Sequence, residues 1–303
     1  MTTDRALEKK LKPIVNALTI DVEDYFQVSA MAPYIERSDW DSTECRVERN
    51  VDRILGLLDE AGAHATFFTL GWIAERHPRV AQRIVAGGHE LASHGYGHQR
   101  ASDQSPDAFL ADIKLAKAVL EDISGVEVQG YRAPSFSIVR GSLWALDVLI
   151  EEGHSYDASI FPIRHDRYGI ADAPRHAHRI DTPAGSIVEV PSSTVRIGQH
   201  NLPIAGGGYF RLLPYAWTRW GMSKLNGAGE PALFYIHPWE IDVNQPRLPV
   251  GRVTALRHYR GLDKTLDRLD TLGKDFAFNT VSAMLAARPV ASVPAAARLA
   301  HAG

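Results

Sequence analysis

The sequence has 303 residues, of which 45% are hydrophobic and 23% charged, a composition that excludes a disordered, collagen-like or coiled-coil chain. Its 33 basic and 36 acidic residues give a formal net charge of -3, so nothing in the charge favours binding to nucleic acid or to an anionic membrane. The length suits one large domain or two small ones with a sizeable core.

Two features of the sequence bear on where the protein works. Residues 1–13 form a polar lead-in without the apolar run of a secretory signal, and no stretch of 18 apolar residues predicts a transmembrane helix. These patterns favour a cytoplasmic location. Cys45 is the single cysteine, which excludes an intrachain disulfide, and we interpret it as an incidental thiol rather than a nucleophile.

The first half of the chain alternates short apolar segments with amphipathic ones. In residues 47–61, for example, Val51, Ile54 and Leu58 recur at helical spacing before Gly62. The predicted strands are residues 15–20, 65–70, 90–93, 130–132 and 154–157, and the predicted helices are residues 47–61, 78–86, 106–124 and 142–152. Such alternation predicts an α/β fold with a mostly parallel sheet, whose chemistry gathers at the carboxyl ends of the strands.

The second half is less regular. Residues 160–230 are rich in proline, glycine and aromatic residues, and the strands at 187–191 and 194–197 are predicted to form a hairpin. The triple glycine 206–208 is interpreted as a loop that closely approaches substrate or another backbone. The remaining predicted elements are a strand at 232–236, a helix at 262–272, a closing segment at 276–285 and a frayed, alanine-rich tail at 286–303. We therefore predict one domain, residues 1–285, with an inserted region at about 160–230.

The first predicted strand ends in three carboxylates, Asp21, Glu23 and Asp24. Asp21 and Glu23 are two residues apart, so they share a face of an extended chain. Carboxylates this close favour a cation or a shared proton between them, and one could bind a metal while another acts as a general base. A solvated acidic turn is the alternative interpretation.

A histidine pair, His94 and His98, follows the predicted strand at 90–93. Histidines four residues apart converge on one ion if the segment forms a helical turn, and imidazole suits Zn²⁺, Co²⁺, Ni²⁺ or Fe²⁺. Two histidines and one carboxylate leave coordination positions open for water and substrate, which is typical of a catalytic metal site. A chance spacing is the alternative.

Three further segments place candidate functional side chains where strands end, although a surface arginine in a loop and a core histidine are the alternative interpretations of Arg132 and His237. Arg132 precedes Pro134 and Ser135, and a guanidinium there can orient a carboxylate. Asp157 ends the strand at 154–157. His237 ends the apolar strand at 232–236 and precedes Pro238 and Trp239, a position suited to proton transfer.

Taken in this order, the five segments resemble the NodB-homology polysaccharide deacetylases (carbohydrate esterase family 4) over roughly residues 15–160 and 230–285. The opening Asp21-Val-Glu-Asp-Tyr-Phe-Gln-Val-Ser-Ala30 and the aromatic region before His237 look like the subgroup tied to the exopolysaccharide loci of bacteria with exosortases (the PEP-CTERM system). The resemblance implies a distorted (β/α) barrel with fewer than eight regular strands.

The resemblance also implies roles. Asp21 matches the catalytic base, and His94 and His98 match the two metal-binding histidines. Arg132 matches the arginine that orients the base. His237 matches the general acid that protonates the leaving amine, and Asp157 matches the acid that tunes it.

The sequence departs from the family pattern twice. Val22 stands where many members have a second aspartate, so the third metal ligand is Glu23 or Asp24, and strand periodicity favours Glu23. Ser135, followed by Phe136, stands where a tyrosine is usual, although a backbone N–H at Ser135 can still stabilise an oxyanion. Trp239, Tyr209 and Phe210 are candidates for stacking on a sugar or for core packing.

The expected function is hydrolysis of N-acetyl groups from hexosamine units of a bacterial polysaccharide or oligosaccharide, with a divalent cation, first of all Zn²⁺, as cofactor. An O-acetyl esterase, another C–N hydrolase, or an inactive carbohydrate-binding relative are the alternatives.

Overall fold

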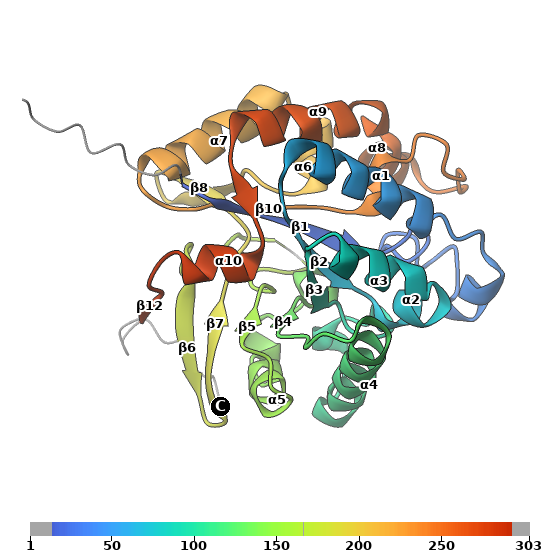
Figure 1. Cartoon of the computed structure of the whole chain (residues 1–303), viewed down its shortest axis with the longest axis horizontal. Helices are drawn as coiled ribbons and strands as arrows, with labels where there is room; N and C mark the ends of the chain where they lie inside the picture. Colours follow the sequence, from blue (N-terminus) through green and yellow to red (C-terminus); the bar gives the residue numbers. More distant parts are fainter. Residues whose placement is uncertain (1–13, 166, 293–303) are drawn as a thin grey trace, which may run out of the picture.

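The main sheet of the computed structural model, which describes residues 14–165 and 167–292, is a long curved array of mostly parallel strands (Figure 1). Its strand order is β10-β1-β2-β3-β4-β5-β7-β6-β12, with β11 paired to β1 and only β6 and β7 antiparallel among these pairs. The strands are β1 (Asn16–Val22), β2 (Thr66–Thr69), β3 (Glu90–Ser93), β4 (Gly130–Tyr131), β5 (Tyr156–Asp157), β6 (His178–Thr182), β7 (Gly185–Glu189), β10 (Leu233–Ile236), β11 (Phe278–Asn279) and β12 (Ala291–Ser292). The predicted α/β fold with a parallel sheet is confirmed.

Helices cover the outside of this sheet, with α1 and α6 to α9 grouped along one side in Figure 1 and α2 to α4 along another. Their bounds are α1 (Val47–Ala61), α2 (Gly71–Arg76), α3 (Pro78–Ala86), α4 (Pro106–Ser124), α5 (Ala145–Glu151), α6 (Gly207–Leu212), α7 (Tyr215–Gly227), α8 (Arg252–Tyr259), α9 (Leu262–Asp275) and α10 (Val281–Ala286). The helices predicted at 47–61, 78–86 and 106–124 therefore occur with the predicted bounds.

Strand β1 shows how the sequence separates the core from the site. Leu18, Ile20 and Val22 face the helices and join the largest hydrophobic cluster, whereas Ala17 packs in a smaller cluster on the other face of the sheet. Burial of each large aliphatic side chain contributes about 1.5–3 kcal/mol to folding. Because side chains alternate along a strand, this packing directs Asp21 to the opposite face from Ile20.

The sheet does not close between β7 and β10 in the part of the chain that the structure describes, which agrees with a distorted barrel. Seven parallel strands precede this gap in the order β10, β1, β2, β3, β4, β5, β7, fewer than the eight of a regular barrel. The segment after β7 crosses the gap, where Ser193 Oγ accepts a hydrogen bond of 2.7 Å from the Leu233 N–H at the start of β10.

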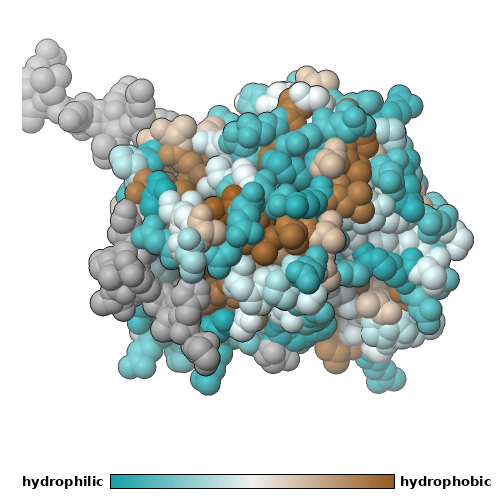
Figure 2. Space-filling view, turned by 90° about the horizontal axis from the view of Figure 1, so that it is seen from below, coloured by the Kyte–Doolittle hydropathy of each residue, from teal (hydrophilic) through white to brown (hydrophobic). Residues whose placement is uncertain are grey.

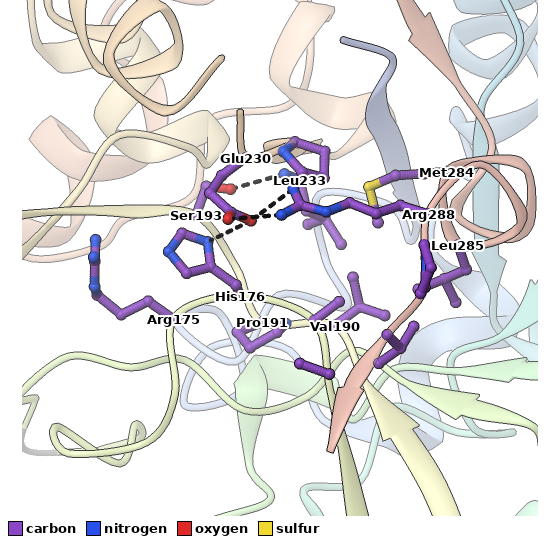
Figure 3. A pocket seen from close by; sticks show the side chains of 15 residues that line it. Arg175, His176, Val190, Pro191, Ser193, Glu230, Leu233, Met284, Leu285 and Arg288 are labelled. Atoms are coloured by element: carbon purple, nitrogen blue, oxygen red, sulfur yellow. Dashed lines mark hydrogen bonds and ion pairs between the residues drawn. The ribbon is translucent and has the colours of Figure 1, made fainter. Parts of the chain in front are cut away.

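A pocket opens at this gap, between the start of β10 and helix α10 (Figure 3). Glu230 lies at its rim between Arg288, at 2.9 Å, and His176, at 3.6 Å, while Val190 and Met284 supply apolar lining. None of the side chains predicted to carry chemistry lines this pocket.

The region from 160 to 230 differs from the prediction. The expected hairpin of 187–191 with 194–197 is wrong, because β7 pairs with the preceding β6, and β8 (Thr194–Ile197) pairs with β9 (His200–Pro203). The triple glycine begins helix α6 rather than forming a loop. It does approach other groups closely, since a side chain at Gly207 would overlap the carboxylate of Glu240.

The predicted domain limits remain predictions. The polar lead-in at 1–13 and residues 293–303 of the predicted tail lie outside the described residues, while Ala291–Ser292 pair with β6 as β12.

The surface mixes residue types. On the face shown in Figure 2, hydrophobic residues form patches interrupted by hydrophilic ones. Among the described residues, no helix has both the length and the apolar character needed to cross a membrane.

Candidate active site

The strand register brings the predicted side chains to one edge of the sheet. Ile20 of β1 pairs with Ile236 of β10, so Asp21 and His237 follow at the same level on neighbouring strands. Ser93 of β3 pairs with Tyr131 of β4, which places His94 and Arg132 side by side in the same way. The carboxyl ends of parallel strands thus collect residues that are more than 200 positions apart in the sequence.

Glu23, His94 and His98 form a cluster in which one ligand atom of each residue lies within 4.8 Å of the others. Glu23 Oε2 is 2.6 Å from His98 Nε2, yet this buried oxygen has no partner with hydrogen-bond geometry. His94 Nδ1 is 2.7 Å from the Arg132 carbonyl oxygen, which leaves His94 Nε2 available to a ligand. Two imidazoles and a carboxylate converging on one point fit a catalytic divalent cation such as Zn²⁺.

The pKa values of His94 and Glu23 favour the unprotonated forms of these two residues. Burial lowers the pKa of His94 to about 4. Burial alone would raise the pKa of Glu23, but the neighbouring charges of His98 and His237 outweigh it and lower that pKa to about 2. A deprotonated carboxylate and a neutral imidazole are the forms that bind metal.

Asp24, the other candidate for the third ligand, points away from the cluster. Its Oδ1 accepts a 2.7 Å hydrogen bond from the Tyr25 N–H, and its Oδ2 accepts one from the Arg46 N–H at the start of α1. Asp24 therefore stabilises the N-terminus of a helix instead of joining the two histidines. Because successive side chains on an extended chain point to opposite faces, Glu23 takes the position on the Asp21 face.

Asp21 is held by a buried arginine, as the resemblance implied. Arg132, which is fully buried, donates to Asp21 Oδ1 at 2.5 Å and to Thr19 Oγ1 at 2.8 Å. The guanidinium also lies 4.2 Å from the centre of the Phe68 ring, so its position is fixed by packing as well as by hydrogen bonds. One carboxylate oxygen is thereby oriented, while Asp21 Oδ2 lies 3.8 Å from His237 Nε2.

His237 is paired with Glu240, whereas Asp157, which the resemblance matched to the acid that tunes His237, contacts other groups. His237 Nδ1 is 3.1 Å from Glu240 Oε2, and the His237 N–H donates to the same oxygen at 3.0 Å. Arg211 of α6 donates to Glu240 Oε1 at 2.9 Å. Burial would raise the pKa of Glu240, but Arg211 and His237 lower it to about 2.

The negative charge of Glu240 in turn affects the pKa of His237. Burial alone would lower the pKa of His237, but the carboxylates of Glu23 and Glu240 outweigh that effect and raise it to about 9. The imidazole is therefore protonated at neutral pH, with Nε2 3.5 Å from Glu23 Oε1. A protonated imidazole at this point can donate a proton to a leaving group.

Asp157 contacts a different set of groups. Its carboxylate accepts a hydrogen bond from Ser159, and the buried Glu189 of β7 lies beside it in the pairing register. Burial raises the pKa of Asp157, and burial together with the charge of Asp157 raises that of Glu189 well above its usual range. Asp157 and Glu189 thus form a buried carboxyl pair on the β5 side of the site, without a hydrogen bond or ion pair to His237.

Trp239 is buried, which agrees with core packing, the alternative to stacking on a sugar. Its ring stacks on His258 at 4.2 Å between centres and lies 5.5 Å from the His237 ring. Its Nε1 donates to Glu23 Oε1 at 3.2 Å. Phe210 is likewise buried in the core, whereas Tyr209 is partly exposed.

Backbone strain also collects at this edge of the sheet. The non-glycine residues with positive φ in the described chain are His98 (55°), Ser135 (56°) and Phe136 (52°). The left-handed conformation costs such residues about 1–3 kcal/mol and persists mainly where the surrounding structure requires it. The Ser135 hydroxyl is held by that of Ser29 at 2.7 Å, so the turn after Arg132 is tied to the segment that follows β1.

Comparisons with known proteins match two parts of the chain to family models. The family model for polysaccharide deacetylases matches residues 39–147, which contain His94, His98 and Arg132. Over these residues the chain is similar to the polysaccharide deacetylases. A second family model, described as a domain of unknown function (DUF3473), matches residues 158–286, which contain Glu189, Arg211, His237 and Glu240.

Among curated proteins, the chain is 30% identical over 96 residues to a peptidoglycan-N-acetylglucosamine deacetylase of Bacillus cereus, covering 31% of this chain and 35% of the relative. It is 31% identical over 119 residues to a peptidoglycan deacetylase of Helicobacter pylori, covering 37% and 38% of the two chains. The matches therefore span less than two fifths of these relatives. A crystal structure from Mycobacterium smegmatis, assigned as a polysaccharide deacetylase, shares the fold with a TM-score of 0.59 at 22% identity, covering 92% of this chain and 94% of the other.

Sequence reasoning missed three buried titratable side chains, those of Glu189, Arg211 and Glu240. Glu189 ends β7 but lies inside the strand predicted at 187–191, so the sequence did not place it at a strand end as it placed Asp157. Arg211 and Glu240 left no comparable signal, since their pairing joins positions 29 residues apart.

Proposed function

We propose that this protein is a metal-dependent hydrolase that removes N-acetyl groups from hexosamine units of a polysaccharide and releases acetate. The observation that carries the proposal is the convergence of Glu23, His94 and His98 on one point, with Asp21 and His237 beside it. The deacetylase relatives support the same reaction class.

The chain supplies a general base in Asp21. A divalent cation bound by Glu23, His94 and His98 would act as a Lewis acid on the acetyl carbonyl and promote ionisation of water. Arg132 binds Asp21 Oδ1 and orients the carboxylate, so that Asp21 Oδ2 is the oxygen available to accept a proton from the attacking water.

His237 supplies the general acid. Its Nδ1 is held by Glu240, which leaves Nε2 directed towards the carboxylates of Asp21 and Glu23, where the scissile bond would lie. When the C–N bond breaks, the proton on Nε2 passes to the leaving nitrogen and an amine departs instead of an unstable amide anion. The turn at Ser135 remains the proposed source of a backbone N–H for the oxyanion.

We further propose that the cation is Zn²⁺ and that the substrate is a bacterial exopolysaccharide. The ligand set of two imidazoles and one carboxylate supports zinc. The DUF3473 segment, with its resemblance to the exopolysaccharide subgroup, supports the second suggestion.

The direct test measures acetate released from N-acetylglucosamine oligomers by purified protein with Zn²⁺ or Co²⁺ supplied. Two adjacent carboxylates provide a matched pair for metal content. Glu23→Gln should lose bound metal and nearly all turnover, whereas Asp24→Asn should keep its metal stoichiometry and lose about 1 kcal/mol of stability through the weakened helix N-terminus.

Three outcomes would contradict the proposal. Acetate release that occurs only from O-acetylated sugars would identify an esterase. If the metal remains bound in Glu23→Gln but is lost in Asp24→Asn, the third metal ligand is Asp24 and not Glu23. A wild-type protein that binds metal and oligosaccharide but releases no acetate would be an inactive carbohydrate-binding relative.

A further inference from the structure

A groove with a cavity volume of about 440 Å³ adjoins the candidate metal cluster, because His98 lines both. Its walls come from the segment after β1, from the segment after His98, and from Arg167. This volume lies within the range of small-ligand sites and would admit a sugar ring. The groove is therefore placed to hold the unit next to the one whose acetyl group is removed.

The groove carries an excess of positive charge. Three arginines line it, Arg37, Arg100 and Arg167, against one acid, Asp103. Arg100 contacts Asp103 at 3.4 Å and also donates to the Arg167 carbonyl oxygen, so its charge is only loosely neutralised. An uncompensated cluster of guanidinium groups in a concave site attracts oxyanions.

Arg37 is held in place without a hydrogen bond or ion pair to any described residue. Its guanidinium lies 4.8 Å from the centre of the Trp40 ring, and it packs so closely on Gly97 that a side chain there would overlap it. Asp112 is the nearest acid that acts on its charge, but that carboxylate accepts hydrogen bonds from the Tyr96 and Gly97 N–H groups. The five N–H donors of Arg37 are thus available to a ligand.

Two glutamine side chains of the groove each have one buried amide atom without a partner, while the other amide atom is hydrogen-bonded. Gln27 is 3% exposed, and its Oε1 accepts from the Asp24 N–H while its Nε2 donates to nothing. Gln104 Oε1 is an acceptor without a partner. A buried polar atom without a partner is unfavourable, and a bound ligand with acidic oxygens and hydroxyl groups would supply the missing partner.

We propose that this groove binds an acidic sugar unit, one bearing a carboxylate or a phosphate, adjacent to the N-acetylated unit at the metal cluster. The inference rests on the proposed function and makes it narrower: the natural substrate is an anionic polysaccharide. The guanidinium groups bind the oxyanion, and the two glutamine amides bind oxygen atoms and hydroxyls of the same ring.

The test compares three substrates with zinc-loaded protein: neutral N-acetylglucosamine oligomers, oligomers alternating N-acetylglucosamine with glucuronic acid, and phosphate-bearing N-acetylglucosamine oligomers. We expect kcat/KM to be at least about tenfold higher for one of the acidic series, mainly through KM, with the advantage falling as salt rises. Whichever acidic series is preferred distinguishes carboxylate from phosphate.

Variants connect the preference to the groove. Arg37→Gln and Arg100→Gln should bring the ratio of kcat/KM for acidic over neutral oligomers towards one. Arg79→Gln, at an exposed arginine of α3 outside the groove, should keep the wild-type ratio. Titration calorimetry of the acidic oligomers with metal-free protein should show the same loss of binding in the two groove variants.

The outcomes separate this inference from the proposed function. Equal or better turnover of neutral oligomers by the wild type would overturn the acidic-sugar site and leave the deacetylase intact. If no oligomer releases acetate, the proposed function fails, but calorimetry still tests whether the groove binds an acidic sugar. Binding of acidic oligomers that is lost in Arg37→Gln supports the acidic-sugar site. Absence of binding to the wild type overturns it.

Discussion

The two halves of the candidate site come from two parts of the chain that differ in regularity. Residues 16–157 supply Asp21, Glu23, His94, His98 and Arg132 from successive parallel strands of a repeating strand–helix pattern. Residues 158–286 supply His237, Glu240 and Arg211 from β10, the short turn after it and helix α6, within an irregular region.

The two parts of the chain hold different groups of the candidate site. The regular part holds the candidate ligands and the base, groups that must converge on a point and therefore benefit from a fixed register. The irregular part holds the proposed acid and its partners, and it also contributes Arg167 to the groove. Metal binding and proton donation should therefore be separable by mutation.

The largest expected effect tests that separation directly. His237→Ala should lower kcat by about 10²–10⁴-fold, because the leaving nitrogen loses its proton donor. Metal stoichiometry should remain that of the wild type, since His237 is outside the ligand cluster. Metal analysis beside acetate assays provides the check, and loss of metal together with activity would show that the two halves do not act separately.

An intermediate effect is expected for Glu240→Gln. Because Glu240 is among the carboxylates that raise the pKa of His237, its removal should lower that pKa. The alkaline limb of the kcat profile, where His237 loses its proton, should move to lower pH, and kcat should fall about tenfold at neutral pH.

Asp157→Asn is the matched control for that profile. Asp157 contacts Ser159 and Glu189 rather than His237, so its substitution should leave the alkaline limb where it is in the wild type. A shift caused by Asp157→Asn and not by Glu240→Gln would restore the role that the family resemblance implied for Asp157.

The same two halves differ in what the sequence could predict. In the regular part, periodicity located α1, α3 and α4 and favoured Glu23 over Asp24, because both conclusions depend only on how side chains alternate locally. Register then follows from the packing of Leu18, Ile20 and their neighbours. The convergence of Asp21, His94 and Arg132 was predictable for this reason.

In the irregular part, the local sequence pattern predicted the wrong strand pairing. Residues 187–197 read as a hairpin, yet β7 pairs with β6, whose alternating burial gives only a weak apolar signal. Likewise, the pairing of Glu240 with Arg211 depends on where α6 packs, and no local spacing encodes it. The sequence could not distinguish a sugar-stacking role from core packing for Trp239, because the exposure of a side chain depends on tertiary packing and not on its sequence neighbours.

The smallest expected effect concerns the contact between the two halves, where Asp157 of β5 lies beside Glu189 of β7. Burial and the charge of Asp157 raise the pKa of Glu189, so the folded protein holds a proton there that the unfolded chain releases above about pH 4.5. The folded state then binds more protons than the unfolded state, and stability falls as pH rises through that range.

Glu189→Gln removes this pH dependence of stability, while its amide oxygen can still accept a hydrogen bond from the Ile160 N–H. Denaturant unfolding should give similar stability for the two proteins near pH 5 and a relative gain in stability for the variant at pH 8. Parallel pH profiles for the two proteins would show that Glu189 is already ionised in the fold. In that case Arg132, which lies close enough to act on its charge, would serve both carboxylates and not Asp21 alone.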